Sequence, residues 1–62
     1  MDQKELSEIA AEIARYVIEQ GKVEKGEWFI PSLGAAVAFE ADERGLENAT
    51  EIAEEAVRLY NK

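Results

Sequence analysis

The absence of cysteine and histidine from a chain of only 62 residues limits how this protein can be stabilised. A chain of this length buries only about 60% of the surface that its unfolded form exposes, so its hydrophobic core is small. Domains of this size commonly rely on disulfides, a bound metal, self-association or very regular helices. Disulfides and the common transition-metal sites are excluded here, which leaves regular helices and self-association.

The spacing of apolar residues predicts a first helix near the N-terminus. Asp2 followed by Glu5 fits a capping box, and Met1 with Leu6 fits a hydrophobic staple. Gly21 supplies a left-handed stop at the other end. Between these signals an apolar side chain recurs every three or four residues, as on one face of a helix. The residues on this face are Leu6, Ile9, Ala10, Ile13, Tyr16 and Val17.

A second stripe of small and apolar residues widens the apolar face of this helix to about twice the roughly 100° that a surface helix needs. The helix therefore packs between two other elements of its own chain, or the second stripe contacts another molecule. We treat the stripe as a candidate self-association face, which would make the protein a homodimer. Its residues are Ser7, Ala11, Ala14 and Ile18.

The segment 21–30 leaves two structural alternatives open. A Lys-Gly pair in its centre is compatible with the two-residue turn of a short β-hairpin that pairs Val23 with Trp28. In that hairpin Glu24 and Glu27 would face each other, and such a like-charge pair opposes the register. The alternative is an irregular loop, and the sequence does not decide between the two.

A second helix follows this segment. Pro31 and Ser32 predict its start, because proline fixes φ in the first turn of a helix and serine is a good cap. The run 33–39 is apolar on every side, so we expect it to be buried. Gly45 ends the helix, and Leu46 lies where a Schellman motif places its hydrophobic contact.

A third helix begins at Asn48, which repeats the capping-box pattern with Glu51. Only three residues separate it from the second helix, so the two should be adjacent and steeply angled or antiparallel. The sequence therefore predicts a mainly α fold, a single small domain over residues 1–62, built as a three-helix bundle with a possible short β-hairpin between the first two helices. The apolar face of the third helix comprises Ala49, Ile52, Ala53, Ala56, Val57, Leu59 and Tyr60.

No catalytic or cofactor-binding machinery is identifiable in the sequence. A nucleophilic triad needs a base beside a serine, and without histidine that base would have to be a lysine or glutamate near Ser7 or Ser32. Ser32 is better explained as a helix cap. The four glycines are isolated, which rules out a phosphate-binding loop, and the calcium-loop spacing is absent. We expect no enzymatic activity, no cofactor and no metal.

Three large apolar residues in succession form the first candidate for partner binding. Trp28, Phe29 and Ile30 would make an interaction patch if all of them were exposed. The competing interpretation is that at least two of them fold under the helices, because little else in this alanine-rich chain supplies core volume.

Negative charge supplies the second candidate. Residues 40–55 carry seven acids against a single base, Arg44. Asp42 and Glu43 lie at the end of the predicted second helix, where the helix dipole favours cations instead. Together with Glu47 they form a candidate surface for a basic partner, although a run of charges is usually just a solvated face.

The overall charge excludes other classes of partner. With 14 acids and 7 bases the formal net charge is −7, so nucleic-acid backbones and anionic membranes should repel the protein. The longest uncharged run has 12 residues, whereas spanning a bilayer takes roughly 20. The N-terminus lacks the basic and apolar regions of a signal peptide. We expect a soluble protein without a nucleic-acid or membrane partner, cytoplasmic if it is natural.

Two hypotheses about function follow. The caps, glycine stops and apolar pattern agree with one another, and ten alanines and twelve glutamates in 62 residues are typical of thermophilic or designed chains. The first hypothesis is a structural or scaffold domain, with de novo design as one possible origin, that self-associates through its first helix. The second is a small acidic binding protein that acts on a basic protein, as an inhibitor, an antitoxin-like partner or a nucleic-acid mimic.

Overall fold

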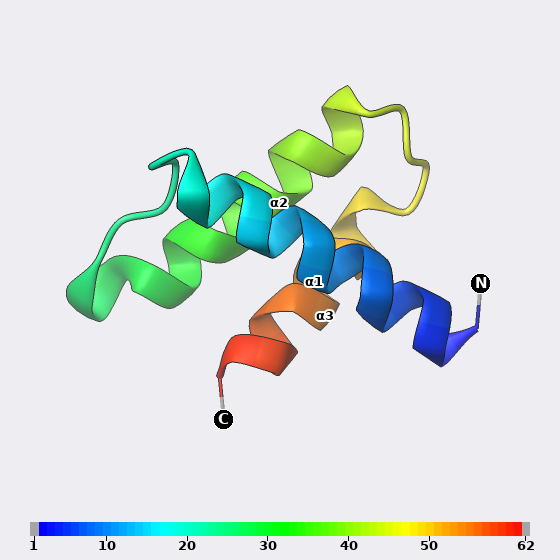
Figure 1. Cartoon of the computed structure of the whole chain (residues 1–62), viewed down its shortest axis with the longest axis horizontal. Coiled ribbons are helices and arrows are strands. Elements are labelled where there is room, and N and C mark those ends of the chain that lie inside the picture. The colour runs from blue at the N-terminus through cyan, green and yellow to red at the C-terminus, as the bar shows by residue number, and fades with distance from the viewer. Residues whose placement is uncertain (1, 62) are drawn as a thin grey trace.

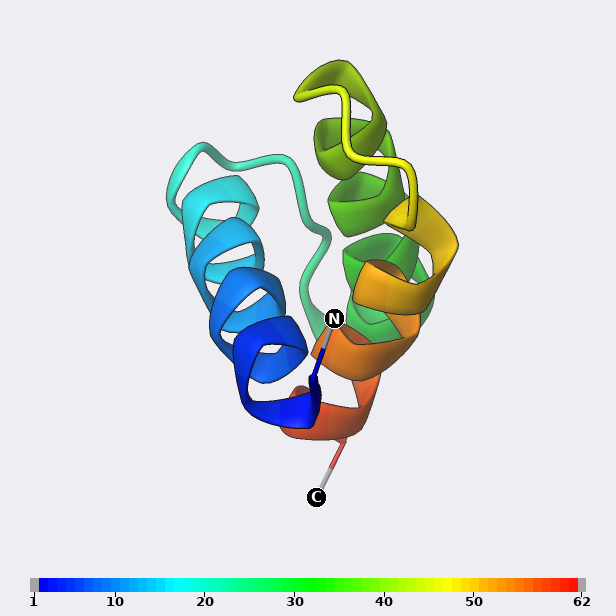
Figure 2. The same ribbon diagram turned by 90° about the vertical axis from the view of Figure 1, so that its right-hand side faces the viewer.

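The computed structural model describes residues 2–61, in which three α-helices pack against one another (Figure 1). They are α1 (Gln3–Glu19), α2 (Phe29–Glu43) and α3 (Ala49–Tyr60), and a short 3₁₀ turn, η1 (Gly26–Trp28), leads directly into α2. Helix α1 lies on one side of the molecule, and α2 and α3 lie side by side on the other (Figure 2). The prediction of a mainly α fold with three helices is confirmed.

The predicted β-hairpin between the first two helices is wrong, because the described residues contain no strand. The φ angle of Gly26 is +82°, and the chain turns there into η1 instead of folding back on Val23. The Glu24 N–H donates to the hydroxyl of Ser32 at 2.8 Å, which ties the segment to α2. Ser32 therefore holds the connector and does not cap its own helix.

Both predicted glycine stops are confirmed. Gly21 and Gly45 follow α1 and α2 with φ angles of +72° and +79°. After α2 the Leu46 N–H donates to the Ala41 carbonyl at 3.1 Å, which is the long bond of a Schellman motif. The equivalent bond after α1 is 3.0 Å long. Leu46 packs against the core, as the sequence predicts.

The starts of the helices agree less well with the predictions. Asp2 accepts a hydrogen bond from the Glu5 N–H at 2.8 Å, which confirms the cap of α1, whereas the staple predicted at Met1 lies outside the described residues. Helix α2 begins at Phe29, two residues before the predicted start at Pro31. Proline is tolerated there because the N–H groups of a first helical turn lack an intrahelical acceptor.

The buried core between the three helices is aliphatic throughout. Phe29 packs against its edge and also contacts Tyr60, with ring centroids 6.1 Å apart. Within the run 33–39 only Leu33 and Val37 are buried, so the prediction of burial for the whole run is wrong. A helix on the outside of a bundle faces its neighbours with one side only. The buried residues are Leu6, Ala10, Ile13, Ala14, Val17, Leu33, Val37, Ala41, Ile52, Ala53 and Ala56.

Polar contacts around Arg44 join α1 to the end of α2 at the surface. Its guanidinium lies 2.9 Å from the Glu40 carboxylate and 3.7 Å from that of Glu12. The same guanidinium lies 5.3 Å from the centroid of the Tyr16 ring. Lys22, in the connector, reaches Glu40 at 3.8 Å and the Tyr16 ring at 5.6 Å. Such partly exposed ion pairs and cation–π contacts are individually weak, so we assign them a positioning role.

Candidate functional site

A groove of about 620 Å³ runs along the outer face of α2, beside the connector from α1. Trp28 and Phe39 stand on its rim, and each keeps 62% of its surface exposed. We call this site the Trp28–Phe39 groove. It is lined by Lys22, Glu24, Trp28, Pro31, Ser32, Ala35, Ala36 and Phe39.

Helical spacing accounts for the apolar surface of the groove. Pro31, Ala35 and Phe39 follow one another at intervals of four residues, which places them in a row on one face of α2. Trp28 ends η1 and extends this row beyond the first turn of the helix. The buried residues Leu33 and Val37 lie on the opposite face. Helix α2 is therefore apolar on both its inner and its outer side.

Two contacts hold the connector that forms the other side of the groove. The Glu24 N–H donates to Ser32 Oγ at 2.8 Å, and Lys22 Nζ lies 3.8 Å from Glu40 Oε1. Both acceptors belong to α2, so the connector follows the helix at two points separated by two turns. The groove therefore exists in the unbound chain and does not need a ligand to assemble it.

Carboxylates lie near both ends of the groove, and one cation, Lys22, also lines it. Glu24 lines the groove near Trp28, and Glu27 immediately precedes that tryptophan. Asp42 and Glu43 follow Phe39 by three and four residues, so they lie one turn further along the same side of α2. Among residues 2–61, none of these four carboxylates has a cationic side chain within ion-pairing distance.

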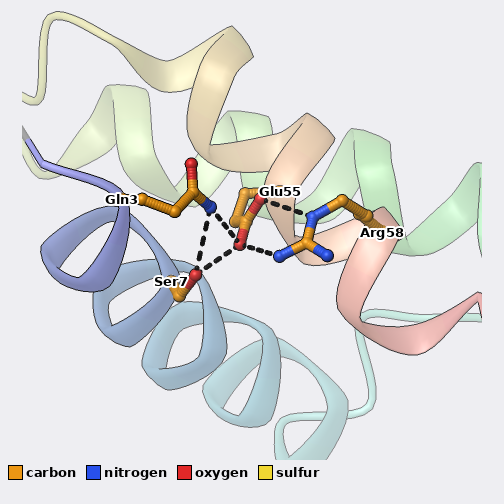
Figure 3. Close-up of polar contacts among 4 residues, drawn as sticks. All are labelled: Gln3, Ser7, Glu55 and Arg58. Carbon is orange, nitrogen blue, oxygen red and sulfur yellow. Dashed lines mark hydrogen bonds and ion pairs between the residues drawn. The ribbon is translucent and has the colours of Figure 1, made fainter.

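A second group of polar side chains lies at the contact between α1 and α3, away from the groove. Figure 3 shows Gln3 and Ser7 of α1 converging with Arg58 on the carboxylate of Glu55 in α3. Arg58 donates to both carboxylate oxygens, at 2.9 and 2.6 Å, and Gln3 donates to one of them at 3.0 Å. The Ser7 hydroxyl donates to that same oxygen. We call these four residues the Glu55 cluster.

The Glu55 cluster stabilises a negative charge that is almost completely shielded from solvent. Only 6% of the surface of Glu55 is exposed. The hydrogen bonds from Arg58 and then Ser7 are the main reasons why the pKa of Glu55 falls from 4.5 to about 2. Burial acts in the opposite direction, and the Gln3 hydrogen bond and the positive charge of Arg58 add to the lowering. The same pairing raises the pKa of Arg58. All partners of Glu55 are donors, so its carboxylate serves to join α1 to α3.

The structure places the four residues of the candidate self-association face largely in contacts within the chain. Ala14 is fully buried, Ile18 packs against the core, and Ser7 bonds to Glu55. Ala11 is half-buried. Helix α1 thus uses most of its wide apolar face against α2 and α3, which is one of the two alternatives that its width allows. Self-association through α1 stays a prediction.

The three successive apolar residues of the partner-binding prediction separate in the structure. Trp28 is exposed and lines the groove, whereas Phe29 and Ile30 are half-buried and Phe29 packs against the core. They therefore do not form a single exposed patch. The second exposed aromatic side chain of the groove is Phe39, which lies eleven residues further along the chain.

The predicted acidic residues are all exposed, but only some adjoin the groove. Asp42 and Glu43 lie next to it, as described above, whereas Glu47 lies in the loop between α2 and α3. Glu55, which the sequence groups with the same acidic run, is instead buried against α1. The run is therefore divided among a groove end, a loop and an interhelical contact.

A second, smaller groove of about 300 Å³ lies between α2 and α3. Gly34 and Val57 approach closely at its base, since a Cβ added to Gly34 would lie 3.2 Å from a methyl carbon of Val57. No large apolar side chain of the described residues stands on its rim, in contrast to the Trp28–Phe39 groove. Its lining residues are Gly34, Ala38, Thr50, Ala53, Glu54 and Val57.

Sequence reasoning missed two residues that the structure brings forward. Phe39 belongs to a run that is apolar on every side, and its exposure follows only from the placement of α2 at the outside of the bundle. Glu55 had a visible signal, because it follows Ile52 by three residues on the apolar face of the third helix. Ser7 is likewise a polar residue within the second apolar stripe of the first helix. A polar residue on each of two apolar faces indicates a buried polar contact.

Neither a metal centre nor a membrane span is found in the described part of the chain. Across residues 2–61, no three His, Cys, Asp or Glu side chains are grouped so that they could hold a metal ion. None of the described helices combines the length and the apolar character needed to cross a lipid bilayer. Comparison of the chain with protein-family models, with curated proteins and with solved structures gave no significant match.

Proposed function

We propose that this protein is a protein-interaction domain that binds its partner through the Trp28–Phe39 groove and catalyses no reaction. The observation that carries this proposal is the placement of two large aromatic side chains on the rim of one groove, each 62% exposed. Tryptophan and other large aromatic residues contribute much of the binding energy at protein interfaces, particularly where they flank a pocket. The proposal develops the hypothesis of a small acidic binding protein.

The small core of the chain strengthens this argument. A domain of 62 residues has little apolar surface to bury, and among residues 2–61 the fully buried positions hold only aliphatic side chains. Trp28 and Phe39 are among the largest apolar residues in the sequence, yet they do not contribute to the core. A domain with a purely structural role gains nothing from leaving them in solvent, whereas a binding domain needs them there.

A peptide selection tests the proposal without assuming any particular partner. Random peptides of about 15 residues, long enough to cover the groove as a helix, are displayed and selected against the intact protein. We expect enriched peptides to bind the protein but not the Ala35→Arg variant, because Ala35 lies exposed on the groove floor. Arginine is a good helix former, so this substitution should fill the groove without unfolding α2.

The matched control is Thr50→Arg, which places the same side chain and charge in the smaller groove between α2 and α3. Enriched peptides should bind this variant as well as they bind the intact protein. If they lose binding to Thr50→Arg instead, the smaller groove is the binding site and the proposal is wrong. A selection that enriches no specific peptide at all also contradicts it.

A further inference from the structure

We infer that the groove binds a basic amphipathic helix, meaning a helical segment with apolar side chains on one face and lysine or arginine at its margins. This inference rests on the proposed function and specifies its partner. Three features carry it, which are the absence of a sheet edge in the described residues, the length of the groove and the unpaired carboxylates beside it.

The described residues offer no sheet edge to an extended peptide. A peptide bound as a strand needs backbone hydrogen-bond partners, as an exposed sheet edge would supply, and the described residues form no sheet. Beyond its first turn, the backbone N–H groups of α2 already bond within the helix. Ser32 Oγ, a polar atom of the lining, accepts the Glu24 N–H. A helical ligand satisfies its own backbone and can present side chains alone to such a surface.

The dimensions of the groove also fit a helix. Trp28 and Phe39 are eleven residues apart, which corresponds to about 16 Å along a helix axis. A ligand helix of about three turns covers this length and brings apolar side chains at positions i, i+3 or i+4, and i+7 onto one face. These side chains would contact Ala35 on the floor and the two aromatic rings at the rim.

The charges around the groove determine the chemistry at the margins of the ligand. Asp42 and Glu43 occupy the last turn of α2, where the partial negative charge of the helix C-terminus adds to their own. Glu24 and Glu27 lie at the other end, and no described cation is paired with any of the four. Lys22 lines the groove and Lys25 lies between Glu24 and Glu27, so the excess of negative charge is at Asp42 and Glu43. Lysine or arginine from a partner would relieve the repulsion at that end.

The same charges disfavour a second copy of this chain as the occupant. Each copy carries a net charge of −7, so two copies repel each other as whole molecules. A chain of opposite net charge is attracted instead. The partner is therefore a different protein, and its docking segment is basic.

Synthetic helices test this inference directly. The probe is a peptide of about 14 residues with leucine on one face and lysine at the margins, and two matched peptides carry glutamine or glutamate in place of lysine. Trp28 is the only tryptophan, so its fluorescence reports occupancy of the groove. We expect the lysine peptide to bind about tenfold more tightly than the glutamine peptide at low salt, and the glutamate peptide to bind least.

Variants of the protein identify which charges are responsible. Asp42→Asn combined with Glu43→Gln should weaken binding of the lysine peptide about three- to tenfold and leave the glutamine peptide unaffected. Glu5→Gln combined with Glu8→Gln removes two exposed carboxylates from α1, and this control should change the dissociation constant by less than about twofold. Carbon chemical shifts of a labelled peptide should show that it is helical when bound.

The possible outcomes separate the inference from the function on which it rests. If all three peptides bind equally and Ala35→Arg abolishes their binding, the groove is a binding site but its partner is not basic. A peptide that binds in an extended form, or a dimer of the protein that Ala35→Arg dissociates, equally overturns the inference and leaves the groove intact as a site. If none of the peptides binds and the random selection also fails, the proposed function is wrong as well.

Discussion

Two regions of the molecule depart from the usual distribution of polar and apolar residues, and they do so in opposite directions. One is the contact between α1 and α3, and the other is the outer face of α2. The first buries a charged carboxylate, Glu55, which is 6% exposed. The second exposes Trp28 and Phe39, each at 62%. The carboxylate has four hydrogen bonds from three partners within the chain, whereas the aromatic side chains at the groove still expose most of their surface.

This difference indicates how to interpret each departure. A buried charge costs stability unless its partners are supplied internally, and the Glu55 cluster supplies them. Exposed aromatic surface on the groove receives no such compensation within the chain, which is the reason to look for compensation from a partner. We therefore assign the first region to stability and propose that the second serves binding. Three predictions, taken from the largest expected effect to the smallest, test this division.

Replacing Glu55 should have the largest effect on stability. Glu55→Ala removes the acceptor for Gln3, Ser7 and Arg58 at once and leaves these donors without their partner between α1 and α3. We expect the melting temperature, followed by circular dichroism, to fall by about 5–10 °C. Glu54→Ala is the matched control, since the neighbouring Glu54 is exposed, and it should change the melting temperature little. Equal effects of the two substitutions would show that the Glu55 cluster contributes no stability.

Acid should remove part of the same stabilisation gradually. The pKa of Glu55 is about 2 in the folded protein and 4.5 as a reference for the unfolded chain, so the unfolded state binds the proton more readily. The contribution of Glu55 is therefore complete above about pH 5 and is lost as the pH falls from 4.5 towards 2. The free energies of unfolding of the intact protein and of Glu55→Gln, measured by urea titration at each pH, should converge over this range. Parallel curves down to pH 2 would contradict the lowered pKa.

Removing the exposed aromatic side chains should have the smallest effect on stability. Trp28→Ser combined with Phe39→Ser is expected to change the free energy of unfolding by about 0.5 kcal/mol or less, since exposed substitutions rarely do more. Peptide binding at the groove should nevertheless disappear. Chemical denaturation measures the first quantity and titration with the lysine peptide the second. A loss of stability as large as that of Glu55→Ala would mean that these rings hold the fold together, and the proposed division would fail.

Local signals in the sequence explain why the ends of the helices were predictable. Asp2 caps α1, and Gly21 and Gly45 end α1 and α2, because each of these roles depends on residues within one or two turns. The start of α2 was misplaced because Trp28, the residue before this helix, has no capping side chain. The sequence could not decide between hairpin and loop, because the local signals of this segment conflict. In the structure the segment is a loop, and the Glu24 N–H donates to Ser32, eight residues away.

The candidate site was harder to predict, because it depends on how the helices are placed. Trp28, Asp42 and Glu43 were identified from composition and from the helix dipole, and all three lie in or beside the groove. Nothing local distinguishes Phe39 from the buried Val37, since both belong to the same apolar run. Which of the two faces solvent is decided by the side of α2 that α1 and α3 cover.

The left-handed turn at Gly26 gives control over how firmly the groove is held. Its φ angle is +82°, and an added Cβ would meet no atom within 4 Å, so L-alanine would be disfavoured there by its backbone alone. A residue of the opposite chirality prefers this backbone region, and a chain of 62 residues can be assembled chemically. D-alanine at this position should raise the free energy of unfolding by about 0.4–1 kcal/mol by restricting the unfolded chain. The handedness of one α-carbon would then set the stiffness of the turn before Trp28 without altering any side chain that lines the groove.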